Sequence, residues 1–379
     1  MSHSRLHTEL CELLGIEYPI LQAGMGRSKG LITTPELVAA VSEAGGLGCI
    51  GGEGLDPDEL RATIRAVRRL TSRPFGVDLL LPAKREPVDL PVAELRDYIR
   101  SQHPDHARFM QSLYDRYGLA QVPYPRQYTV TDTLIRQQVQ VVVEERVPVF
   151  VAGLGDPGPF VPALRERGIK VLGIAGSPRH ARRQKAAGVD AVIAQGYEAG
   201  GHTGNIATMV LVPQVVDEVR PLPVVAAGGI VDGRGLVAAL ALGASGVWCG
   251  TLFLFSREAN VHDAHRQQLL QAAAEDLVVS RCYTGKPSRV YRNEVVELWQ
   301  RQGPEPLGFP LQMLLMDDFV TSAEAQGRLD LVNNPAGQAA GRLTAVRPAG
   351  EIVRSLVAEA EEVIGRLSGQ PVQRPAGGR

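Results

Sequence analysis

The chain has 379 residues, of which 41 are acidic and 40 are basic, and its formal net charge is −1. It has no long block of like charge, which argues against nucleic-acid or membrane-surface binding, and no run reaches the ~18 apolar residues that span a bilayer. We therefore expect a soluble, cytoplasmic protein. The four cysteines, Cys11, Cys49, Cys249 and Cys282, lie far apart without CxxC spacing, so isolated buried thiols are favoured over a zinc site or disulfides.

Short apolar segments alternate with helical segments from residue 19 onward. Three strands are predicted at residues 19–25, 47–51 and 74–82, and the third carries one carboxylate, Asp78, in an otherwise apolar run. Thr34 and Pro35 predict the start of a helix that ends at Glu43. Asp56 and Pro57 predict the start of a second helix, which runs through Leu70.

The alternation lapses between residues 83 and 133, where prolines interrupt a polar segment. Aromatic residues and a helical pattern at 107–117 argue against disorder. A connection of this length is more often a lid or an interaction surface than a linker. We expect it to cover the mouth of a site or to form a homodimer contact.

The alternation then resumes, with strands predicted at residues 148–153, 170–175, 190–194, 223–230 and 246–253. Helices are predicted near 134–145, from Asp156-Pro157, from Ser177-Pro178, over 207–219 and from Asp232. Eight apolar strands that alternate with helices indicate an α/β protein with a parallel sheet, closed as a (β/α)8 TIM barrel. A doubly wound open sheet is the rival, and it would more often show GxGxxG after its first strand.

The predicted domain organisation has four parts. Residues 1–260 form the barrel with its insertion at 83–133, and 261–345 form a smaller helical lid or substrate region. Residues 346–367 form a terminal helix that packs on the barrel, and 368–379 form a disordered tail rich in Pro, Gly and Arg.

The most distinctive stretch is 195–204, Gln-Gly-Tyr-Glu-Ala-Gly-Gly-His-Thr-Gly, which follows the sixth strand. Glycines there let backbone N–H groups approach a flat or anionic ligand. Further glycines end the seventh strand, at Gly228-Gly229, and the eighth, at Gly250-Thr251. In barrels of this kind the last two strand ends commonly hold a phosphate, so a phosphorylated ligand is predicted. The alternative is that these glycines serve only the turns.

Four motifs together resemble the nitronate monooxygenase family, formerly called 2-nitropropane dioxygenases. They are the Gln-Ala-Gly-Met segment at 22–25, the stretch at 195–204, Ala-Ala-Gly-Gly-Ile at 226–230, and the glycine and threonine pattern at 246–251. The resemblance runs from Tyr18 to Trp299. It implies an FMN-dependent enzyme with a TIM barrel and a smaller added domain, similar to FMN-dependent enoyl-acyl-carrier-protein reductases and to NADH:quinone reductases.

The resemblance also implies roles for individual residues. The segment 23–25 would lie along the flavin ring, and Gln195 would hydrogen-bond the ring or the ribityl chain. His202 would be the catalytic residue, facing the reacting side of the flavin. Asp78 stands where the family commonly has asparagine, so it would be protonated or would accept from a ring N–H or a ribityl hydroxyl. The implied cofactor-binding residues are Ala23, Gly24, Met25, Asp78, Gln195, Gly200, Gly201, Gly228, Gly229, Gly250 and Thr251, and no metal site is implied.

The chemistry that the resemblance implies is oxidation of an alkyl nitronate, such as propionate 3-nitronate, by FMN and O2 to a carbonyl compound and nitrite. His202 would act as a base for a neutral nitroalkane, as a donor to the nitronate oxygens, or only as an orderer of its loop. Lys286, Arg289 and Arg292 are candidates to hold an anionic substrate, although a solvated basic turn is the simpler interpretation.

Three alternatives remain. The first is a reductase that uses NAD(P)H to reduce a quinone or an enoyl thioester. The second is a non-catalytic barrel that binds a phosphorylated metabolite, which would be colourless where a flavoenzyme is yellow. The third, an inosine-monophosphate-dehydrogenase-type barrel, is disfavoured because no cysteine lies between strands six and seven.

Overall fold

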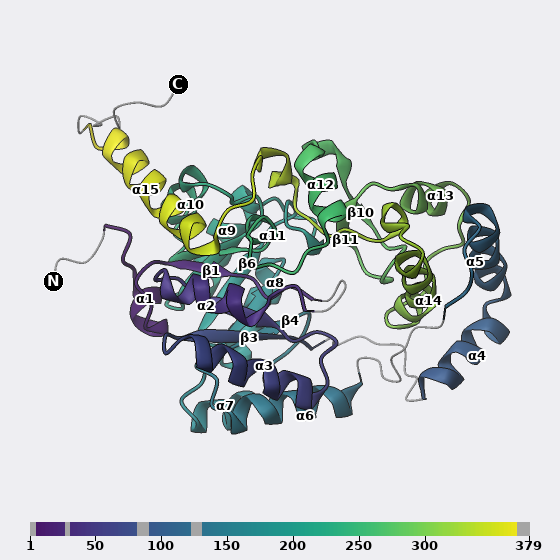
Figure 1. Cartoon of the computed structure of the whole chain (residues 1–379). Helices are drawn as coiled ribbons and strands as arrows, with labels where there is room; N and C mark the ends of the chain where they lie inside the picture. Colours follow the sequence, from purple (N-terminus) through teal and green to yellow (C-terminus); the bar gives the residue numbers. More distant parts are fainter. Residues whose placement is uncertain (1–4, 27–30, 82–90, 123–130, 370–379) are drawn as a thin grey trace.

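A computed structural model describes residues 5–26, 31–81, 91–122 and 131–369. Its centre is an eight-stranded parallel sheet in the order β1-β9-β8-β6-β5-β4-β3-β2. Helices such as α2, α3, α6 and α7 lie outside this sheet (Figure 1). The Leu21–Leu47 bridge joins β1 to β2, and the Gln22 N–H donates to the Leu47 carbonyl at 2.8 Å, which closes the barrel. The strands are β1 (Ile20–Gln22), β2 (Gly48–Gly51), β3 (Phe75–Leu80), β4 (Val149–Gly153), β5 (Lys170–Ala175), β6 (Ala191–Gln195), β8 (Val224–Ala227) and β9 (Gly246–Cys249). The predicted TIM barrel is confirmed.

The outer helices begin at the caps that the sequence predicts. The side chains of Thr34, Ser177 and Asp232 each accept a hydrogen bond from a first-turn backbone N–H. Asp56 forms a full capping box with Glu59. The outer helices are α2 (Pro35–Glu43), α3 (Pro57–Leu70), α6 (Asp132–Glu144), α7 (Val161–Glu166), α8 (Pro178–Ala187), α9 (Thr208–Val219), α10 (Gly233–Ala241) and α11 (Thr251–Leu254).

Several predicted boundaries are wrong. The predicted strands 19–25 and 223–230 end three residues too late, since β1 ends at Gln22 and β8 ends at Ala227. The Asp156 carboxylate accepts from the Gly158 N–H at 2.8 Å and forms a turn there, so α7 begins only at Val161. The last barrel strand ends at Cys249, and Thr251 begins α11 because the chain bends at Gly250.

Side chains alternate between two cores along each strand, as the two-residue period of a strand requires. Ile20 and Phe150 pack outward against the helices, whereas Leu21 and Val151 fill the barrel interior. Helix α1 (Glu9–Leu14), which the pattern did not predict, packs its apolar residues on that interior cluster. All four cysteines are buried and free.

A second region follows the barrel and is not only helical. Strands β10 (Leu277–Ser280) and β11 (Ser288–Tyr291) pair with the two-residue β7 (Gly201–His202) in an antiparallel sheet. The helices are α12 (Asp263–Gln271), α13 (Glu294–Gln302) and α14 (Leu311–Ala325), with 3-10 turns η1 (Ala274–Asp276), η2 (Leu329–Leu331) and η3 (Gln338–Arg342). The region 261–345, predicted as helical, therefore also contains two strands.

The described part of the insertion forms α4 (Val92–Gln102) and α5 (Pro104–Tyr117), which confirms the helical pattern at 107–117. These helices gather with α13 and α14 at one side of the barrel (Figure 1). The Phe109 ring meets the Trp299 ring edge-on at 4.9 Å, and Arg96 forms a 2.8 Å ion pair with Asp318. Residues 83–90 and 123–130 of the insertion lie outside the described residues.

The terminal helix α15 (Ala349–Leu367) packs against α10 and α2 on the barrel wall. The Gly233 N–H donates to Glu359 at 2.9 Å, and a Cβ at Gly233 would collide with the α15 backbone. Of the predicted tail, residues 370–379 lie outside the described residues. No helix in the described ranges is long and apolar enough to cross a membrane.

Candidate active site

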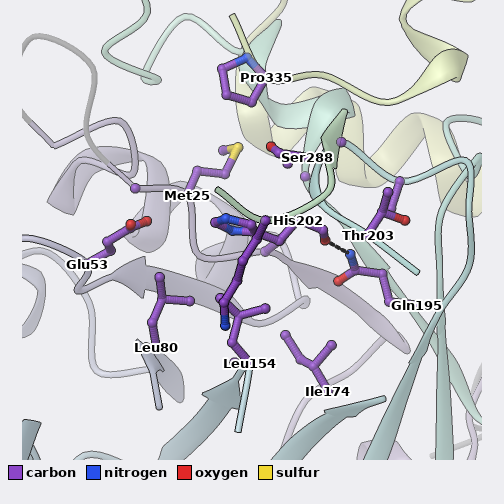
Figure 2. A pocket seen from close by; sticks show the side chains of 18 of the residues that line it. Met25, Glu53, Leu80, Leu154, Ile174, Gln195, His202, Thr203, Ser288 and Pro335 are labelled. Atoms are coloured by element: carbon purple, nitrogen blue, oxygen red, sulfur yellow. Dashed lines mark hydrogen bonds between the residues drawn. The ribbon is translucent and has the colours of Figure 1, made fainter. Parts of the chain in front are cut away.

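One cavity of about 1840 Å³ lies at the carboxyl ends of the barrel strands. Its far wall comes from the second region, including α14 and the segment between β10 and β11. Figure 2 shows Met25, Glu53 and His202 directed into the same space from different elements. None of residues 91–122 of the insertion lines it. All twelve predicted site residues do: Ala23, Gly24, Met25, Asp78, Gln195, Gly200, Gly201, His202, Gly228, Gly229, Gly250 and Thr251.

The segment that follows β1 contains Gly24 and Gly26, because the carboxyl groups of Asp78 and Glu53 leave no space for a side chain at these positions. A Cβ at Gly24 would lie 2.5 Å from the Asp78 Cβ, and one at Gly26 would collide with the Glu53 carboxylate. Only glycine therefore lets this backbone pass between the two acids. The backbone is thus left bare along this edge of the cavity.

Asp78 is a buried acid in an unusual state. Burial raises the pKa of Asp78 to about 8, and the nearby Glu53 carboxylate adds to this rise. Oδ1 of Asp78 has no hydrogen-bond partner among the described residues. A carboxyl group with this pKa is mostly protonated at pH 7, so like an asparagine amide it offers both a donor and an acceptor. Protonated Asp78 therefore presents a donor and an acceptor to the cavity.

Two further acids line the cavity, Glu53 after β2 and Asp317 on α14. Burial raises the pKa of Glu53 to about 7, and it raises the pKa of Asp317, on α14, to about 7 with the charge of Asp318 adding to the rise. The sequence does not predict that Asp317 lines the cavity, because no local pattern shows that α14 folds over the mouth of the barrel. Glu53 could have been found by the rule that polar residues just after barrel strands line the site.

The segment that carries His202 is held from both ends. Gln195 Nε2 donates to the His202 carbonyl at 2.5 Å, and His202 pairs with Ser288 of β11. His202 is therefore in a short strand, not in the loop that was expected. Across this sheet the Arg289 side chain is 1% exposed, donates to the Tyr197 carbonyl at 2.8 Å and stacks on the Tyr197 ring at 4.4 Å.

Of the three basic residues proposed to hold a substrate, only Lys286 lines the cavity. Arg289 is buried, so the interpretation of the whole stretch as a solvated basic turn is wrong for it. The Arg289 guanidinium donates hydrogen bonds to the Tyr197 carbonyl, in the loop after β6, and to the Leu277 carbonyl of β10. These bonds connect the segment that carries His202 to the second region. Arg292 donates to the Glu275 carbonyl at the surface.

The hydrogen bonds around His202 assign its tautomer. Nε2 of His202 lies 3.2 Å from the Thr284 hydroxyl, and that hydroxyl donates its only proton to the Lys286 carbonyl, also at 3.2 Å. With the Thr284 proton on the Lys286 carbonyl, His202 Nε2 carries a proton and donates to Thr284, which leaves a lone pair on Nδ1. Burial lowers the pKa of His202 to about 4, and the Lys286 charge contributes, so the ring is neutral at pH 7.

The two terminal glycine clusters form an open cradle beside this site. Gly228 and Gly229 have φ values of 105° and 74°, which L-residues rarely adopt. A Cβ at Gly229 would meet only Glu198, at 3.6 Å, and one at Gly250 would come no closer than 3.5 Å to Ala23. The cradle therefore adjoins the bare segment after β1, which suits a ligand with a phosphate at one end and a flat ring at the other.

Comparison with known proteins agrees with these features. The nitronate monooxygenase family model matches residues 7–359. A protein named as a probable nitronate monooxygenase, from Staphylococcus saprophyticus, is 35% identical, and the match covers 96% of this chain and 100% of that protein.

Two solved structures are similar over nearly their whole length. Thermotoga maritima FabK is 35% identical with a TM-score of 0.75, and the match covers 96% of this chain and 99% of FabK. Streptomyces ansochromogenes nitroalkane oxidase is 31% identical with a TM-score of 0.80, and the match covers 94% and 99%. The chain belongs to the nitronate monooxygenase family and is a flavin-dependent oxidoreductase.

Proposed function

We propose that this enzyme binds FMN and uses O2 to oxidise alkyl nitronates, such as propionate 3-nitronate, to a carbonyl compound and nitrite. In balanced form, two nitronate anions and one O2 give two carbonyl compounds and two nitrite ions. The observation that carries the proposal is the neutral, tautomer-fixed His202 beside a lysine, inside the cavity where the phosphate cradle and the bare segment meet.

The chain's residues fit FMN. Gly229 and Gly250 leave room for a phosphate, and the backbone at Gly24 and Gly26, which carries no side chain, leaves room for a ring. The unpartnered Oδ1 of protonated Asp78 supplies a hydrogen-bonding group where the flavin would lie. A mononucleotide suits this set better than FAD, because the sequence has no dinucleotide fingerprint. When bound, FMN supplies the electron transfer between the nitronate and oxygen.

His202 and Lys286 favour an anionic substrate over its neutral precursor. The Nδ1 lone pair can take a proton from the α-carbon of a nitroalkane, but a base with a pKa of about 4 has little driving force at pH 7. Proton transfer would also create a second cation beside Lys286. A preformed nitronate needs no proton removed, and the Lys286 ammonium attracts its charge.

Nitrite formation by the wild-type enzyme and by His202→Ala tests this proposal. We expect the variant to keep its flavin, because the implied flavin contacts come from other residues. Activity on a neutral nitroalkane should fall by about 10²-fold, the low end of the usual worth of a general base, because the pKa of His202 is far below pH 7. Activity on the nitronate should fall less. The wild-type kcat/KM on the nitroalkane should be flat above pH 5 and should decline toward pH 4. Equal losses on both substrates would contradict the base role.

The second candidate function is NAD(P)H-dependent reduction of a quinone or an enoyl thioester. Two observations favour it: the likeness to FabK, and a cavity that exceeds the ~300–1,000 Å³ of common small-ligand sites. Anaerobic reduction of the bound flavin by NADPH, at a rate that matches turnover, would establish this function in place of the first.

A further inference from the structure

The basic residues of α8 divide into two sets. Arg182 forms a 2.7 Å ion pair with Glu218, and Lys185 donates to the Arg220 carbonyl at 2.6 Å. Arg179 and Arg183, which are four residues apart and so share one face of the helix, line the cavity instead. Within the described residues neither of these two guanidinium groups has a carboxylate or carbonyl acceptor.

The electrostatic surroundings of His180, between the two arginines, are positive. His180 also lines the cavity. Burial lowers the pKa of His180, and the charges of Arg179 and Arg183 lower it further, with no acidic group acting against them. Asp156 lines the same cavity, but its carboxylate is engaged by the Gly158 N–H. Asp156 keeps its negative charge in this hydrogen bond, but among the described residues it forms no ion pair with Arg179 or Arg183. This wall therefore carries two guanidinium charges against one carboxylate.

Small residues keep space open beside these arginines. Ala186 and Ala187 continue the cavity wall along α8. Gly158 comes from the loop after β4, and a Cβ on it would lie 3.6 Å from the Ala187 Cβ. The cavity volume of about 1840 Å³ leaves room for a second large ligand beside a mononucleotide.

We propose that Arg179 and Arg183 bind the phosphate group of a second ligand, a phosphorylated co-substrate that enters along α8. This site is distinct from the FMN cradle. The cradle lies after β8 and β9, whereas α8 follows β5, and β6 stands between β5 and β8 in the barrel. The inference does not depend on nitronate oxidation, because it concerns binding alone.

The donor set favours a phosphate over a carboxylate. One guanidinium can satisfy both oxygens of a carboxylate, whereas two guanidinium groups and an imidazole match the three terminal oxygens of a phosphate monoester. Binding of a dianion would also reverse the local field and favour the protonated form of His180. A rise in the pKa of His180 would therefore indicate that the site is occupied.

The test measures equilibrium binding to the flavin-loaded protein at low and high salt. NADPH is compared with NADH, and coenzyme A with its 3′-dephospho form, because each pair differs by one phosphate monoester. The variant Arg179→Met/Arg183→Met is compared with Arg182→Met, a matched change on the same helix away from the cavity. The flavin spectrum of each variant verifies that the site is intact.

We expect the phosphate-bearing member of at least one pair to bind more tightly than its partner, and this preference to weaken with salt. The double variant should lose about tenfold or more of that affinity, since charge-assisted hydrogen bonds are the strong ones, and Arg182→Met should lose none. NMR should show the pKa of His180 rising in the complex. The NADPH arm points to a nucleotide source and the coenzyme A arm to an acyl carrier. No preference in either pair, or an equal loss in both variants, would overturn the site.

Discussion

At the scale of single residues, the chemistry of the site depends on groups whose pKa values are shifted from their ordinary values. His202 is kept neutral by burial and by Lys286, and Asp78 is kept protonated by burial and by Glu53. Asp78 is therefore neutral where a carboxylate is usually ionised at pH 7, and His202 stays neutral even in mildly acidic solution.

Thr284 positions His202 by fixing which ring nitrogen holds the proton. In Thr284→Val the Nε2 proton loses its acceptor, so both tautomers should be populated. Activity on a neutral nitroalkane should fall about fivefold, the worth of one neutral hydrogen bond of ~1 kcal/mol, and Thr284→Ser should restore it. Nitrogen-15 NMR of His202 measures the tautomer directly. An unchanged spectrum in the valine variant would mean that Thr284 has no positioning role.

Because of Asp78, the free energy of unfolding should decrease as the pH rises. Its pKa is about 8 in the folded protein and near 3.8 in the unfolded chain, so between these values the folded state holds a proton that the unfolded state has released. Stability should therefore decline from pH 4 to pH 8, by at most about 1.4 kcal/mol per pH unit for this one proton.

The matched variant Asp78→Asn removes this titration and keeps the hydrogen-bonding pattern. Denaturant midpoints of the flavin-free protein, measured from pH 5 to pH 8, should fall less steeply in the variant than in the wild type. The remaining slope should come in part from Glu53 and Asp317, whose pKa values are also raised. Parallel curves for the two proteins would show that Asp78 is ionised in the fold.

At the scale of elements, the sequence predicts the helices and strands whose positions are set by residues close together in the chain. Apolar runs and caps such as Thr34 and Asp56 located the eight strands and most of the outer helices, because strand period and capping act within a few residues. The sequence also predicted that the glycine clusters lie together at one mouth, because the carboxyl ends of all strands in a barrel meet at one end.

The second region could not be predicted in the same way. Strand β7 has two residues and exists only because β11, more than 80 positions later, pairs with it. Arg289 looked like a solvated residue, since the sequence does not show that Tyr197 and two carbonyls bury it. Thr284 and Asp317 reach the site through this long-range packing, and no local pattern marks them.

A substitution in the turn after β8 should abolish flavin binding without preventing folding. In Gly229→Val a side chain would enter the open cradle, at a backbone φ of 74° that costs a non-glycine residue ~1–2 kcal/mol. Gly168→Val is the control, because Gly168 has a φ of 71° and a Cβ there meets nothing within 4 Å. Both variants should fold with similar small losses of stability. Only Gly229→Val should lose its flavin, and retained flavin in that variant would rule out this turn as the phosphate site.

At the scale of the whole molecule, the barrel supplies the floor of the cavity and the second region supplies its far wall. The described insertion helices α4 and α5 contribute no lining residue and instead support α14 from outside, through contacts such as the Arg96–Asp318 ion pair. The roles predicted for the insertion, as a cover or a homodimer contact, stay predictions.

The most direct test of the central claim is the visible spectrum of the purified protein during anaerobic mixing with propionate 3-nitronate, followed by admission of air. The account predicts a yellow protein whose released cofactor is FMN. It also predicts that the flavin absorbance bleaches on mixing and returns with nitrite formation when oxygen enters. A colourless protein, or a flavin that NADPH bleaches and the nitronate leaves unchanged, would contradict it.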